Sequence, residues 1–228
     1  MNSFTSIMGL CAGAGLLLTV GIGYKLVWRS APEQGASPAP PISWAGWSIT
    51  LAVTGVILTV SGGVMYLFYP LDVPGEQSKN FIFGEPSAVY GLLLIATAAY
   101  LWRRGSHLTL DRIYAVLSPI ALLVGGIGLV MTSNAVGALG NQIFETAPEC
   151  EPVLGTWPSW IIGPALTTII TILPGLGCLA FSAAAWSRKR AAWLLCGAAW
   201  TLAGIGLVAL GVFVPGAHIF MEYCALSQ

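Results

Sequence analysis

The stretch IYAVLSPIALLVGGIGLVMTSN at residues 113–134 contains no Asp, Glu, Lys or Arg. A hydrocarbon core of about 30 Å is crossed by about 20 residues of α-helix, and backbone that faces lipid must satisfy its own hydrogen bonds. The stretch is therefore predicted to be a transmembrane helix, and this decides the fold class of the chain.

Comparable apolar stretches lie on both sides of this helix. Of the 228 residues, 56% are hydrophobic and only 8% are charged, whereas about a quarter of an ordinary soluble domain is charged. We therefore expect an all-α fold, a polytopic membrane bundle of about six transmembrane helices that forms one domain over residues 1–228. The predicted spans are residues 5–24, 44–69, 87–102, 113–134, 159–186 and 191–214.

The basic residues predict the orientation of the chain in the membrane. Lys and Arg near the ends of spans are retained on the cytoplasmic side, and eight of the nine fall in three alternate loops. We expect a multi-pass protein of the bacterial inner membrane with both termini outside the cytoplasm. The loops at residues 70–86 and 135–158 are also expected to lie outside the cytoplasm. The eight basic residues are Lys25, Arg29, Arg103, Arg104, Arg112, Arg188, Lys189 and Arg190.

The first cytoplasmic loop, at residues 30–43, has the composition of a flexible linker. Its residues 30–41 read SAPEQGASPAPP, which is too poor in apolar side chains to pack by itself. Because this linker separates the first span from the others, the first helix is expected to be tethered to the bundle and not embedded at its centre.

Prolines mark special positions in two spans. Pro86 suits the first position of the third helix, so Glu85 would lie at the positive helix terminus as a cap; the alternative is a functional residue. Pro164 and Pro174 are expected to kink the fifth span, either as a gate or as a plain packing feature. The hydroxyls that could bond the freed carbonyls belong to Thr167, Thr168 and Thr171.

Several short motifs resemble those of a known family. They are Tyr69-Pro-Leu71, the segment Asn80-Phe-Ile-Phe-Gly-Glu-Pro86, the helix that begins Tyr90-Gly91, and Arg112-Ile-Tyr-Ala115. Together they resemble an uncharacterised bacterial family of multi-pass membrane proteins, the domain of unknown function numbered 981. The cysteine-bearing loop at residues 148–154 and the tail at Cys224 look like departures from that pattern. The resemblance implies a membrane topology and no mechanism.

Polar residues predicted to lie outside the cytoplasm form a candidate cluster. His218 and Glu222 are spaced i to i+4 and would share a helical face if a helix continues past Pro215. Glu85 and Glu145 could join them. Imidazole with carboxylates is a ligand set for zinc or copper, with His218 and Glu222 as the metal ligands. The alternative is a histidine that makes one hydrogen bond or faces lipid headgroups.

The five cysteines divide by predicted location. Cys11, Cys178 and Cys196 fall within spans, whereas Cys150 and Cys224 fall in outer segments. Because the outer side is an oxidising compartment, we expect a disulfide between Cys150 and Cys224. The alternative is two unpaired outer thiols.

The sequence points away from catalysis. The two histidines, His107 and His218, are predicted on opposite sides of the membrane, so bis-histidine haem ligation is excluded. No phosphate-binding glycine loop, zinc-protease helix or serine elbow is present, and no cofactor is expected apart from the candidate metal.

The leading hypothesis is a non-catalytic accessory or assembly subunit of a larger inner-membrane complex, with lipid and other membrane subunits as partners and no nucleic acid. The alternatives are a small-solute carrier or pore, and an outer-face metal or redox site.

Overall fold

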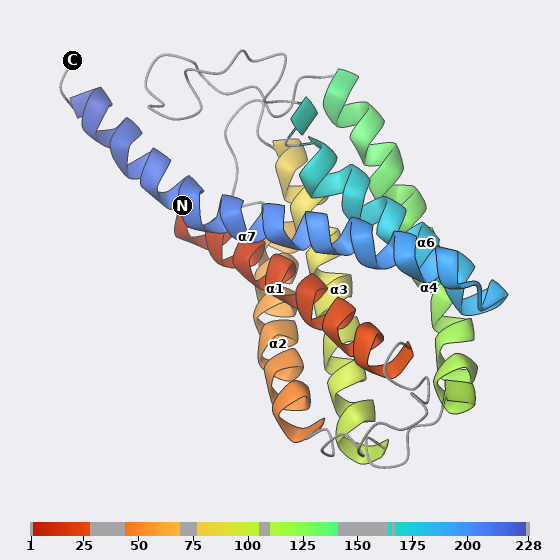
Figure 1. Ribbon diagram of the computed structural model, residues 1–228. Helices are drawn as coiled ribbons and strands as arrows, with labels where there is room; N and C mark the ends of the chain where they lie inside the picture. The colour runs from red at the N-terminus through yellow and green to blue at the C-terminus, as the bar shows by residue number, and fades with distance from the viewer. Residues whose placement is uncertain are drawn as a thin grey trace, which may run out of the picture.

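Among the residues that it describes, the computed structural model contains six helical spans long and apolar enough to cross a membrane. It describes residues 2–27, 44–68, 77–104, 110–140, 164–165 and 167–226. The start of α1 and the end of α7 lie toward the same side of the bundle (Figure 1), as an even number of crossings requires. The elements are α1 (Asn2–Val27), α2 (Trp44–Phe68), α3 (Gln77–Arg104), α4 (Leu110–Gly140), the π-helix η2 (Thr168–Ile172), α6 (Leu173–Ser187) and α7 (Arg190–Leu226).

Helices α2 and α3 form a tightly packed antiparallel pair (Figure 1). Glycines remove the side chains that would hold the two backbones apart, as small residues do in membrane bundles. A Cβ built on Gly62 would lie 2.5 Å from the backbone nitrogen of Ala88. One built on Gly91 would lie equally close, at 2.5 Å, to the backbone nitrogen of Thr59. The pair therefore depends on glycine at these positions.

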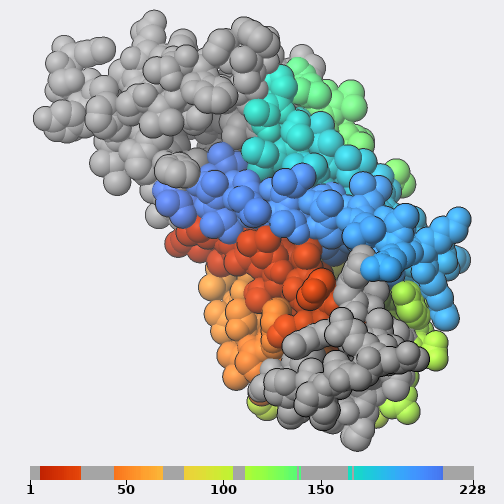
Figure 2. Space-filling view, viewed as in Figure 1, coloured from red at the N-terminus to blue at the C-terminus, as the bar shows by residue number. Residues whose placement is uncertain are grey.

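Helix α1 lies directly against α7, and both cross the face shown in Figure 2. Gly13 meets the carbonyl of Gly204 at the crossing, and Leu16 and Ile22 are buried in two separate core clusters. Helix α1 is therefore packed against the bundle and not merely tethered to it, although it lies on an outer face and not at the centre. The linker composition was a poor guide because glycines on α1 and α7, far apart in the sequence, allow a close helix contact.

The third helix also differs from the prediction. Residues 77–86, expected in an outer loop, belong to α3, so Pro86 lies inside the helix and Glu85 is not at its N-terminus. The capping interpretation of Glu85 is therefore wrong. Packing explains the difference, because Asn80 is fully buried and Gly84 contacts Gly62 and Tyr66 of α2. Proline is tolerated inside membrane helices when neighbouring groups support the backbone.

The outer loop predicted at residues 135–158 also starts later than expected, because α4 extends to Gly140.

The fifth span begins with the π-helix η2, and α6 follows it directly, with Pro174 as the second residue of α6. Pro164 precedes η2. The hydroxyl of Thr171 donates to the carbonyl of Thr167 at 2.7 Å, so it serves the helix in which it lies. π-Helical turns are rare, and they occur mostly as single turns inserted into α-helices, as here.

Candidate functional site

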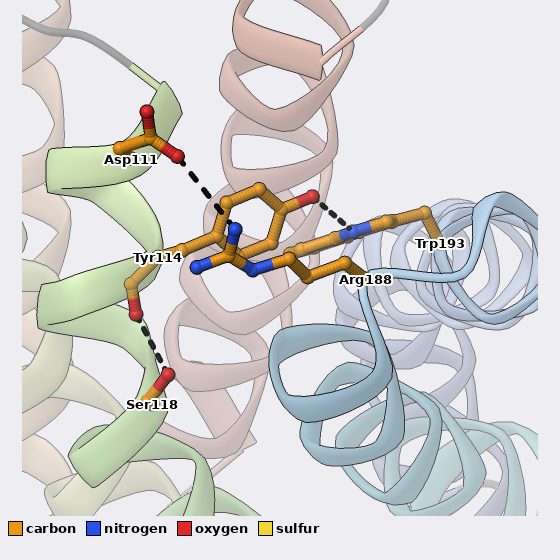
Figure 3. Close-up of polar contacts among 5 residues, drawn as sticks. All are labelled: Asp111, Tyr114, Ser118, Arg188 and Trp193. Atoms are coloured by element: carbon orange, nitrogen blue, oxygen red, sulfur yellow. Dashed lines mark hydrogen bonds and ion pairs between the residues drawn. The ribbon is translucent and has the colours of Figure 1, made fainter.

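Arginines and lysines collect at one end of the bundle, which we call the basic end. Here α1, α3 and α6 finish and α2, α4 and α7 begin. At this end a cluster of polar and aromatic side chains joins the start of α4 to the turn between α6 and α7 (Figure 3). The basic residues that the structure describes here are Lys25, Arg103, Arg104, Arg112, Arg188, Lys189 and Arg190.

Arg188 is the centre of this cluster. It ends α6 in a left-handed conformation with φ of 55°, which is uncommon for a residue other than glycine. The turn directs its guanidinium group between two residues of α4 (Figure 3). Nη1 lies 3.6 Å from the carboxylate of Asp111, and the group lies 4.7 Å from the centre of the Tyr114 ring. Because the ion pair is largely exposed, it contributes little to the stability of the fold. The cation–π contact contributes about 0.5–1 kcal/mol.

Tyr114 connects this charged pair to an aromatic row inside the bundle. Its hydroxyl accepts a hydrogen bond of 3.1 Å from Nε1 of Trp193 on α7. Trp193 packs edge-on against Phe181 of α6 at 5.8 Å, and Phe181 stacks on Trp200 at 5.6 Å. Nε1 of Trp200 donates to the carbonyl of Pro174 at 3.3 Å. The row therefore links α4, α6 and α7 from the basic end to the junction with the π-helix.

This arrangement holds helices in position and supplies no recognisable reaction centre. Arg188 and Asp111 are exposed, and the aromatic groups are satisfied by one another and by backbone. A similar contact joins α1 to α2, where Nζ of Lys25 lies 4.4 Å over the Trp47 ring. Lys and Trp tend to collect near the ends of membrane spans, and this contact lies near the end of α1 and the start of α2.

Replacing Tyr114 with phenylalanine tests the polar link. The change keeps the ring beneath Arg188 but removes the acceptor for Trp193, which is part-buried. We expect a loss of about 1 kcal/mol and an apparent Tm lower by about 3 °C, measured by thermal unfolding in detergent. Asp111→Asn is the control and should change Tm by less than about 2 °C, because its ion pair is exposed. A larger effect of Asp111→Asn than of Tyr114→Phe would contradict this ranking.

The predicted outer cluster is only partly described. Glu85 is exposed on α3, while Glu145 lies outside the described residues. The helix does continue past Pro215, so positions 218 and 222 are one turn apart on α7, although the side chains of His218 and Glu222 are outside the described part. Among the residues that could be searched, no group of three or more His, Cys, Asp or Glu side chains could hold a metal ion.

The predicted disulfide also falls outside the described side chains. Cys150 lies in the undescribed segment before η2, and Cys224 is described only as a helical position of α7. Cys11, Cys178 and Cys196 are free thiols within spans.

We predict that Cys150 and Cys224 are joined. A loop of about 75 residues closed by a disulfide gains up to about 4 kcal/mol on the chain-entropy model. The measurement is mass spectrometry of a digest alkylated without reduction. Recovery of the two cysteines as separately alkylated peptides would show that they are unpaired.

Sequence reasoning did not identify the cluster at the basic end. Arg188 was counted only for orientation, and Tyr114 entered only as part of the Arg112–Ala115 motif. The sequence did contain a signal for this cluster, because Tyr114 lies just inside the fourth predicted span and Trp193 just inside the sixth. Aromatic residues at such positions commonly make polar contacts at the interface. Which of them pair could not be known without the packing of α4 against α6 and α7.

Several of the residues that carry the family resemblance make contacts within the bundle, although Tyr69-Pro-Leu71 lies outside the described residues. Gly84 and Gly91 provide the close contact of α3 with α2, and the hydroxyl of Tyr90 lies 3.2 Å from that of Thr19 on α1. Asn80 is fully buried, and Tyr114 belongs to the cluster described above.

Comparison with known proteins gives one family. No curated protein and no solved structure matches the chain. The model of one family, described as a protein of unknown function (DUF981), matches residues 1–221, which is nearly the whole chain. The chain therefore belongs to the DUF981 family of proteins of unknown function.

Proposed function

We propose that this chain is a non-catalytic accessory or assembly subunit of a larger complex in the bacterial inner membrane. The supporting observation is one face of α2, directed away from the rest of the bundle, which we call the α2 outward face. It consists of Gly46, Ile49, Val53, Val56, Val60, Gly63 and Leu67.

The α2 outward face has the spacing of a helix–helix seam. From Ile49 to Leu67 its members recur at alternating steps of four and three residues, the repeat that keeps a stripe facing a partner helix. All its branched side chains are more than half exposed. The opposite side of α2, with Leu51, Leu58 and Met65, is fully buried. The seam is thus available for a helix of another chain.

Glycines within the seam favour a protein partner over lipid alone. A Cβ built on Gly46 or on Gly63 would meet nothing within 4 Å. A lipid-facing helix needs apolar side chains, whereas small residues permit the close backbone approach that drives association of membrane helices. Inside this chain the same device already joins α2 to α3 through Gly62 and Gly91.

The test is purification of the tagged chain from its native membrane in a mild detergent. A subunit should bring membrane protein partners in stoichiometric amounts, whereas a carrier or a metal-binding protein should not. Gly63→Leu should leave the yield of the chain unchanged and reduce partner recovery about tenfold, because the added side chain fills the seam.

Gly126→Leu is the matched control, since a Cβ on Gly126 of α4 also meets nothing within 4 Å. It should retain the partners. Purification of the wild-type chain alone, or full partner recovery with Gly63→Leu, would refute the proposal.

The proposed orientation places the basic end in the cytoplasm and both termini outside. Its support is the collection of Lys and Arg at that end. A reporter active only in the periplasm should be silent when fused after Arg104 and active when fused after Gly155. The reverse pattern would invert the orientation.

A further inference from the structure

A cavity of about 390 Å³ opens at the basic end between α3 and α4. Its lining is Tyr100 and Arg104 from α3 with Arg112, Ala115 and Val116 from α4. The cavity exists because α3 packs mainly on α2 and α4 mainly on α6, so that α3 and α4 touch each other little. We propose that this cavity binds the phosphate of an anionic phospholipid headgroup.

Charge is the first argument. Two arginines line one cavity from two different helices, and guanidinium groups match phosphate oxygens in geometry and charge. Among the described residues, the lining contains two arginines, a tyrosine and no acid, so this part of the cavity offers positive charge and a phenol to a ligand. Basic pockets between membrane helices are typical sites for anionic lipid headgroups.

The position of the cavity along the membrane helices is the second argument, and it favours a lipid headgroup over free phosphate as the ligand. Trp102 lies on α3 between Tyr100 and Arg104 and is 65% exposed. Tyr24 and Trp186, at the same end of α1 and α6, are also exposed. Exposed Trp and Tyr residues mark the headgroup level of a membrane. The cavity therefore lies where phospholipid phosphates are concentrated.

An apolar track for an acyl chain is the third argument. Ala115 and Val116 form the apolar wall of the cavity, and seven residues further along the same face of α4 come Leu122 and Leu123. Both leucines are more than half exposed. Leu122 lies about 15 Å along the helix from Arg112, which is about half the thickness of the hydrocarbon core. A phosphate at the arginines would thus continue into a chain along α4 within one leaflet.

The experiment titrates the delipidated full chain with phosphatidylglycerol or phosphatidylcholine in detergent micelles and counts bound lipid by native mass spectrometry. Phosphatidylglycerol should bind in preference to phosphatidylcholine. Arg104→Gln with Arg112→Gln should weaken its binding about 30-fold. The control removes the same charge at the same end through Arg103→Gln with Lys189→Gln, neither of which lines the cavity, and should change binding less than about twofold.

A second variant separates shape from charge. Ala115→Trp keeps both arginines but fills the cavity from an exposed position on α4, and should weaken phosphatidylglycerol binding about tenfold. Equal loss in the cavity and control variants would overturn the proposal, as would equal binding of the two lipids. Displacement of the lipid by inorganic phosphate alone would overturn the assignment to a lipid headgroup.

Discussion

Replacing Gly91 with leucine should separate α2 from α3 and cause the largest loss of stability of any single change considered. A Cβ at this position would lie 2.5 Å from the backbone nitrogen of Thr59 and 2.6 Å from the carbonyl of Gly55. Both obstacles are backbone atoms, so no rotamer change can relieve the contact. We expect a loss of about 3 kcal/mol and an apparent Tm lower by about 10 °C in detergent.

The control for Gly91→Leu is Gly63→Leu on α2. The side chain added is the same, but a Cβ on Gly63 meets nothing within 4 Å. Its Tm should stay within about 2 °C of wild type. A comparable loss of stability in both variants would mean that leucine is tolerated poorly for reasons other than the α2–α3 contact.

The second large effect is expected from Gly13→Leu, which tests whether α1 is part of the bundle. A Cβ on Gly13 would lie 2.6 Å from the carbonyl oxygen of Gly204 and 2.8 Å from the backbone nitrogen of Val208, both on α7. The measurement uses the full chain with a protease site placed at Gly35 and cut after purification. In the wild-type protein, α1 should remain bound through gel filtration. In Gly13→Leu its recovery should fall about tenfold or more.

Gly23→Leu is the matched variant for this experiment, because Gly23 lies on the same helix and a Cβ there meets nothing within 4 Å. It should retain α1 after cleavage. Loss of α1 from the cleaved wild-type protein would restore the tethered helix that the linker composition predicts.

The candidate sites show where sequence reasoning was insufficient. Glu85 beside Pro86 predicted a helix terminus, yet α3 begins at Gln77 because the segment packs against α2 through Gly84 and is anchored by the buried Asn80. Propensity is a weak guide where tertiary contacts stabilise a helix. The cavity at Arg104 and Arg112 could not be predicted either, since Arg104 served only as a marker of orientation and Arg112 only as such a marker and as part of a family motif.

What the sequence determined by itself is the number of membrane helices. Runs of about 20 apolar residues can be satisfied in a bilayer only as helices, so the six spans of the described residues follow from local composition. The first, second, fourth and sixth of them begin within about three residues of the predicted positions. Gly84, Gly91 and Tyr114, which belong to the motifs that carry the resemblance, occupy positions of contact between helices.

Only the tertiary structure decided which helices pair, and hence where the contacts and the cavity lie. Apolar side chains are equally soluble in lipid and in a bundle, so hydrophobicity does not select the partner of a membrane helix. The partner of a helix is selected by how closely the two backbones can approach each other. This approach depends on glycines that are far apart in the sequence, such as Gly13 and Gly204. The neighbours Gly62 and Gly63 look alike in the sequence, but one contacts α3 and the other faces open space.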